Sequence, residues 1–129
     1  MNPDNQPQLE GTILTGFTPI PQVATLEKID TVEGTGAEVA PGATVTVHYT
    51  GALASTGVIF QSSHDRGEPI TFGLSQVISG WTEGVPGMKV GGTRRLLIPA
   101  EQAYGPSSPA PNIPPNSDLV FDIELVAIA

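Results

Sequence analysis

Alternating apolar and polar residues predict β-strands along much of the chain. Between residues 44 and 50, Val45, Val47 and Tyr49 occupy one face of an extended segment, whereas His48 and three threonines occupy the other. A period of two with one apolar face is typical of a half-buried antiparallel strand. The same period predicts strands at 70–74 and 119–125, and further candidates lie at 94–98 and, more weakly marked, at 23–29.

A single segment has the spacing of an amphipathic helix. Ser75 is suited to cap its N-terminus, and Gly80 lies inside it at a cost of about 1 kcal/mol relative to Ala. Because Gly80 has no side chain, a strand could approach the helix closely at that point. The apolar face of the predicted helix consists of Val77, Ile78, Trp81 and Val85. Several strands and one helix predict an α+β fold.

The first 22 residues show no sustained hydrophobic period and are rich in proline, asparagine and glutamine. This composition predicts an N-terminal arm at residues 1–22, followed by a folded domain at 23–129. Two alternatives stay open for the arm: it is flexible, or its apolar residues lie along a groove on the domain surface. Those apolar residues are Ile13, Leu14, Phe17 and Ile20.

A second proline-rich segment covers residues 105–117, between Tyr104 and the last predicted strand. A loop of this length without regular structure is uncommon in a compact domain and is usually functional. We therefore expect this loop to have a functional role.

The charge of the chain excludes several classes of partner. Its 129 residues, enough for one domain, include 13 acidic and 5 basic residues and carry a formal net charge of −8. Nucleic-acid binding requires a basic surface, so no nucleic-acid partner is expected.

No apolar run reaches the roughly 18 residues of a membrane-spanning helix, and residues 1–11 lack the features of a signal peptide. We expect a cytoplasmic protein, or an extracytoplasmic one if an N-terminal anchor has been removed.

The polar residues form no recognisable catalytic or metal-binding cluster. Cysteine is absent, which excludes disulfides, thiolate zinc sites and a cysteine nucleophile. His48 and His64 are not at metal-ligand spacing, and no Gly-x-Ser-x-Gly motif is present. Asp122 and Glu124 share the polar face of a predicted strand, where we expect a solvated pair rather than acid–base catalysts. We therefore expect neither a metal nor a cofactor.

The aromatic residues are the remaining candidates for a site. In a fold with one helix, Trp81 and the aromatic residues of the facing strands must lie close together. They are either part of an ordinary hydrophobic core or the walls of a binding pocket. The aromatic residues of the chain are Phe17, Tyr49, Phe60, Phe72, Trp81, Tyr104 and Phe121.

A series of short motifs between residues 24 and 127 resembles one known family. The motifs are VHYTG at 47–51, FQSS at 60–63, VISGW at 77–81, EGV at 83–85, GM at 87–88, VG at 90–91, AYG at 103–105, IPP at 113–115 and LVFD at 119–122. Each motif is weak alone, but their order and spacing resemble those of the FKBP-type peptidyl-prolyl cis/trans isomerases. The resemblance implies an antiparallel sheet curled around one short helix, with an apolar pocket between them.

The resemblance also implies which residues form the site. The catalytic pocket would consist of Tyr49, Phe60, Ile78, Trp81, Tyr104 and Phe121, and the further ligand-binding positions are Gln61, Arg66, Ile70, Val77, Asn112 and Ile113. In the family, the backbone N–H matching Ile78 and the hydroxyl matching Tyr104 hydrogen-bond the carbonyl groups of the ligand, and the residue matching Trp81 forms the floor.

Several positions differ from the family pattern. Gln61 stands where the family usually has Asp, which can pair with the position matching Arg66. Ile70 replaces a common aromatic wall, and Pro109 and Asn112 replace more usual His and apolar residues in the long loop. These differences predict weaker binding of macrolide inhibitors.

Three functions follow as alternatives. The first is a monomeric prolyl isomerase that acts on proline-containing peptides and unfolded proteins and so assists folding. The second is a non-catalytic binding or chaperone module of the same fold, which Gln61 and the altered loop favour. The third, an unrelated small β-domain in an envelope or adhesion role, is opposed by the complete aromatic set.

Overall fold

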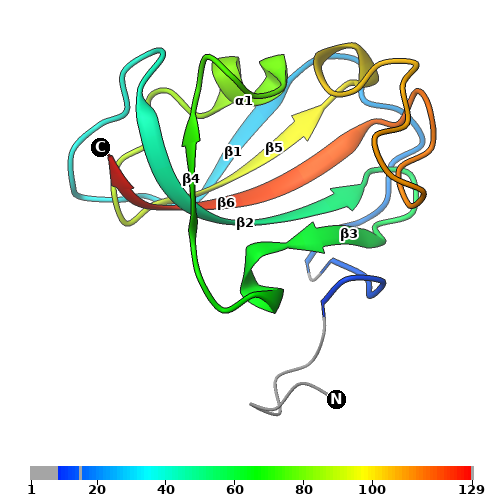
Figure 1. Cartoon of the computed structure of the whole chain (residues 1–129), viewed down its shortest axis with the longest axis horizontal. Helices are drawn as coiled ribbons and strands as arrows, with labels where there is room; N and C mark the ends of the chain where they lie inside the picture. The colour runs from blue at the N-terminus through cyan, green and yellow to red at the C-terminus, as the bar shows by residue number, and fades with distance from the viewer. Residues whose placement is uncertain (1–8, 15, 129) are drawn as a thin grey trace.

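A six-stranded antiparallel sheet curls around one short helix in the computed structural model, which describes residues 9–14 and 16–128 (Figure 1). The strand order is β1-β5-β6-β2-β3, and β4 pairs with β2 beside this path. The strands are β1 (Glu27–Val32), β2 (Thr44–Leu53), β3 (Ile59–Ser62), β4 (Ile70–Gly73), β5 (Thr93–Ile98) and β6 (Leu119–Ile128). The helix α1 covers Ser79–Gly84, and two 3₁₀ turns cover Ser63–Asp65 (η1) and Ala100–Gln102 (η2). The predicted α+β architecture is confirmed.

The concave face of the sheet and α1 enclose the main hydrophobic core. Val45, Val47 and Tyr49 of β2 are all buried, as their period of two predicted. Gly80 brings α1 against β5: a Cβ atom at this position would lie 2.6 Å from the side chain of Ile98. The predicted close approach of a strand at Gly80 is therefore confirmed.

The helix is shorter than its hydrophobic spacing predicted. Ser75 caps nothing, because residues 74–77 form turns and α1 begins only at Ser79. The hydroxyl of Thr82 donates to the carbonyl oxygen of Leu74 at 2.6 Å, which holds this turn against the helix. α1 ends just before Pro86, which has no backbone N–H to continue the helical hydrogen bonds. Within the described residues, no helix has the length and hydropathy to cross a bilayer.

The first strand also differs from its prediction. β1 covers Glu27–Val32, whereas the weak period suggested 23–29. The backbone N–H of Val23 donates to Asp118 at 2.7 Å, so this residue is held in a loop and not in the sheet. Val23 is nevertheless buried, in a second apolar cluster on the opposite face of the sheet.

The described part of the predicted arm runs beside β3 (Figure 1). Gly11 donates a backbone hydrogen bond to Ile59, and Ile59 donates one to Thr12. Leu14 is buried in the second apolar cluster, where Phe17 and Ile20 pack against it. Residues 1–8 and 15 of the predicted arm lie outside the described residues, and the domain boundary at residue 22 stays a prediction.

Candidate active site

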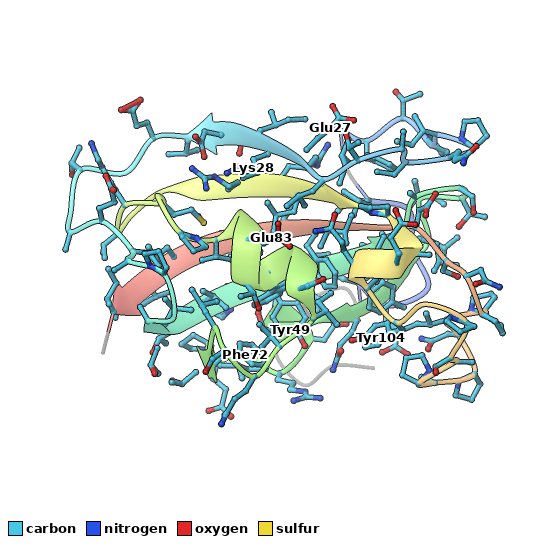
Figure 2. The ribbon with its side chains drawn as sticks, turned by 90° about the horizontal axis from the view of Figure 1, so that it is seen from above. Glu27, Lys28, Tyr49, Phe72, Glu83 and Tyr104 are labelled. Carbon is cyan, nitrogen blue, oxygen red and sulfur yellow. The ribbon has the colours of Figure 1, made fainter. Side chains whose placement is uncertain are left out.

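A cavity of about 450 Å³ opens between α1 and the concave face of the sheet. Figure 2 shows Tyr49, Phe72 and Tyr104 on the same side of α1, on different elements of the chain. The lining residues are Tyr49, Phe60, Gln61, Arg66, Ile70, Phe72, Gln76, Val77, Ile78, Trp81, Tyr104 and Phe121.

Trp81 lies at the centre of an aromatic cluster that forms the apolar part of this cavity. Its ring centroid is 5.5 Å from that of Tyr49, 5.2 Å from that of Phe72 and 5.4 Å from that of Phe121. The interplanar angles are 80°, 74° and 87°, so all three contacts have the edge-to-face geometry that aromatic quadrupoles favour. Phe60 makes a similar contact with Phe121. These contacts give the cavity rigid, apolar walls.

The structure brings most of the predicted site residues together. All six predicted catalytic residues and four of the predicted binding residues, Gln61, Arg66, Ile70 and Val77, line the cavity. Asn112 and Ile113 do not line it; they belong to an adjoining groove on the side of the 105–117 loop. The Asn112 side chain donates to the carbonyl oxygen of Phe60 at 3.0 Å, which ties this loop to β3. The roles of these residues stay predictions.

Two lining residues were not among the predicted site residues. Phe72 shares a face of β4 with Ile70, so its alternation with polar neighbours was a usable signal. Gln76 gave no such signal, because it lies before the first residue of α1, in a segment that the helical spacing had predicted to be part of the helix.

Two hydrogen-bond donors are free at the cavity. Neither the backbone N–H of Ile78 nor the hydroxyl of Tyr104 donates to another residue in the described part of the chain. Ile78 precedes α1 with an extended backbone, at a ψ angle of 146°. Burial raises the pKa of Tyr104 above its usual value, so this hydroxyl keeps its proton at neutral pH. Both groups can donate to the carbonyl oxygens of a bound peptide.

The positive charge of Arg66 also interacts with Tyr49 in the cavity. Burial raises the pKa of Tyr49, and this effect outweighs that of the Arg66 guanidinium, which acts to lower the same pKa. The phenol of Tyr49 therefore stays neutral at physiological pH, like that of Tyr104.

The histidines lie outside the cavity. His48 and His64 stack with their ring centroids 4.3 Å apart. His48 is 2.9 Å from the hydroxyl of Ser63, and His64 is 2.6 Å from a carboxylate oxygen of Glu124. Neither histidine is a lining residue.

The prediction that Asp122 and Glu124 are solvated holds for Glu124, whose side chain is 47% exposed, but not for Asp122, whose side chain is 25% exposed. Both side chains are partly buried, and Glu124 has the His64 partner described above. Asp122 accepts two hydrogen bonds from Arg95, at 2.6 and 2.8 Å. Arg95 and Asp122 face each other across β5 and β6, a cross-strand pairing that the alternation within one strand could not reveal.

Comparisons with known proteins agree with this geometry. A family model described as FKBP-type peptidyl-prolyl cis-trans isomerase matches residues 36–126. The chain is 45% identical over 119 residues to peptidyl-prolyl cis-trans isomerase FPR2 of Saccharomyces cerevisiae, covering 91% of this chain and 87% of that protein. It is 48% identical over 101 residues to an FK506-binding protein of Neisseria meningitidis serogroup B, covering 77% of this chain and 92% of that protein.

Solved structures show the same likeness. FkpA from Escherichia coli superposes with a TM-score of 0.72 at 46% identity, covering 80% of this chain and 47% of FkpA. AtFKBP13 superposes with a TM-score of 0.72 at 39% identity, covering 84% of this chain and 96% of AtFKBP13. This chain thus spans about half of FkpA but nearly all of AtFKBP13.

Fold and site together define a prolyl isomerase domain, with an aromatic cavity under one helix and a curled antiparallel sheet. The chain belongs to the family of FKBP-type peptidyl-prolyl cis-trans isomerases.

Proposed function

We propose that the protein isomerises X–Pro peptide bonds in the aromatic cavity, and that its substrates are proline-containing peptides and unfolded proteins. The observation that carries this proposal is the combination of apolar aromatic walls with the two free donors of Ile78 and Tyr104. We also propose that the protein acts as a monomer.

The chemistry of the reaction fits such a cavity. The planar X–Pro amide owes a rotational barrier of about 18–20 kcal/mol to its partial double bond. The planar form is more charge-separated than the twisted form, so transfer from water to apolar walls disfavours the planar form more. Donors that hold the neighbouring carbonyl groups favour the conformation of the transition state. Each ~1.4 kcal/mol removed from the barrier accelerates exchange tenfold, and no proton is transferred.

An exchange assay tests this function directly. The substrate is a short peptide with an apolar residue before proline, because this residue would also contact the apolar walls. Uncatalysed exchange takes about 10–100 s, and we expect added protein to accelerate it measurably over buffer in exchange NMR or a protease-coupled assay. Exchange at the buffer rate, together with retained peptide binding, would instead favour a non-catalytic binding module.

The isomerisation rate should be nearly constant between about pH 6 and 8. His is the side chain that ordinarily titrates in this range, and neither His48 nor His64 lines the cavity. The raised pKa values of Tyr49 and Tyr104 lie above their usual value, so both phenols lose their protons only in more alkaline solution. A bell-shaped profile of kcat/KM within this range would contradict the proposed mechanism and indicate acid–base catalysis.

We further propose that the cavity binds macrolides such as FK506. The Neisseria meningitidis relative is named an FK506-binding protein, and the aromatic cavity offers the apolar surface that such a ligand would bury. Gln61, in place of the usual Asp, supports an affinity below that of relatives with the carboxylate.

A further inference from the structure

A second groove, of about 410 Å³, adjoins the aromatic cavity. The two spaces share Phe60, Gln61 and Arg66 as lining residues. The outer walls of the groove come from Glu10 in the N-terminal segment and from Ala110, Asn112 and Ile113 of the long loop. A peptide whose proline occupies the cavity therefore has a continuous path for its flanking residues.

Arg66 stands where the cavity and the groove meet. Among the described lining residues of the aromatic cavity, it is the only one with a charged side chain. Its guanidinium forms no hydrogen bond or ion pair with any described residue, whereas Arg94 and Arg95 are both ion-paired. Its backbone is fixed, because its N–H donates to the carbonyl oxygen of Ser63 at 3.1 Å. Arg66 is thus an uncompensated cation at a fixed place beside the cavity.

The acidic residues of the groove do not pair with this cation. Asp65 accepts backbone hydrogen bonds from Leu9 at 2.8 Å and from Glu10 at 3.0 Å, so its carboxylate already has partners. The side chain of Glu10 is exposed on the groove wall formed by the N-terminal segment, and Glu10 does not line the aromatic cavity. The charge nearest to a bound X–Pro bond is therefore positive, although the chain as a whole carries −8.

We infer that Arg66 is a specificity-determining residue that favours substrates with a carboxylate side chain next to the X–Pro bond. This inference rests on the proposed isomerase function. A guanidinium binds a carboxylate through two parallel hydrogen bonds. Because Arg66 is exposed, the gain is that of a solvent-exposed ion pair, about two- to fivefold in affinity.

The test uses peptides that are acetylated at the N-terminus and amidated at the C-terminus and that differ from one another at one residue. Glu, Gln or Lys is placed immediately before proline in one series and immediately after it in the other. In at least one series, wild-type protein should show a kcat/KM for the Glu peptide about two- to fivefold above that for the Gln peptide, mainly through KM. This Glu-to-Gln ratio should fall to about one or below in Arg66→Gln. In Arg66→Glu, kcat/KM should instead be higher for the Lys peptide than for the Glu peptide. The ratio of the wild-type protein should decrease with added salt.

Two further variants separate the local effect of Arg66 from net charge. Lys28→Gln removes the same charge from β1, on the opposite side of α1 from Tyr49 (Figure 2), and should leave the Glu-to-Gln ratio unchanged. Glu10→Gln removes the competing carboxylate of the groove and should increase this ratio.

Equal Glu-to-Gln ratios in wild type and Arg66→Gln would overturn the inference, as would a preference of the wild type for Lys peptides. NMR titration of the same peptides measures the preference in Kd without catalysis. If no peptide is isomerised, the isomerase proposal fails, while the ratio of Kd values still decides on Arg66.

Discussion

Replacement of Trp81 by Ala should lower the free energy of unfolding by about 3–5 kcal/mol and remove most of the isomerase activity. Trp81 is only 4% exposed and its side chain contacts three aromatic rings, so its truncation leaves an unfilled space beneath the cavity. Stability is measured by urea unfolding and activity by peptide exchange. Because a domain of this size is stable by only about 5–15 kcal/mol, folding of the variant must be established before its activity is interpreted.

Trp81→Phe provides the matched control. It keeps an aromatic ring and removes an indole N–H that is buried without a hydrogen-bond partner in the described part of the chain. We therefore expect a smaller loss of stability than in Trp81→Ala, with part of the activity retained. A folded Trp81→Ala variant with wild-type activity would show that Trp81 is not the floor of the site.

Gln61→Asp should raise the affinity for FK506 about tenfold. A carboxylate that accepts a ligand hydroxyl forms a charge-assisted hydrogen bond worth about 1.5–3 kcal/mol, roughly twice the value of a neutral one. The difference, of order 1.4 kcal/mol, corresponds to a factor of ten in Kd. Isothermal titration calorimetry on the wild type and the variant measures this difference. Peptide isomerisation should change less, since a peptide amide offers no such hydroxyl.

Gln76→Glu is the control for this prediction, because Gln76 also lines the cavity. It introduces the same charge at a different place and should not reproduce the gain in affinity. If Gln61→Asp leaves the affinity unchanged or lowers it, the weaker binding is better explained by Pro109 and Asn112 in the long loop.

The strands could be predicted from the sequence because their faces differ in solvation. Residues 44–49 of β2 and 121–125 of β6 alternate between buried and less buried positions, so these strands followed from a period of two. β1 could not be placed in the same way: all six of its residues are exposed, and the strand is positioned by its pairing with β5. The predicted helix was too long, because Val77 and Ile78 have helical spacing with Trp81 but precede the first helical residue.

The residues of the candidate site could likewise be predicted where they depend on local sequence features, but not where they depend on packing. The aromatic residues and the family motifs are local features, and they identified ten of the residues that line the cavity. Gln76 and the separation of Asn112 from the cavity depend on how a turn and a loop pack, which no local period encodes.

The amino-acid sequence by itself determined the fold class, the family and the aromatic composition of the site, because these depend on the identity and spacing of residues along the chain. Only the tertiary structure decided which charges are compensated. Arg95 meets Asp122 across two strands, the N-terminal segment occupies the carboxylate of Asp65, and Arg66 has no partner among the described residues. Electrostatic interactions depend on distances in space between residues far apart in the chain, and folding alone sets those distances.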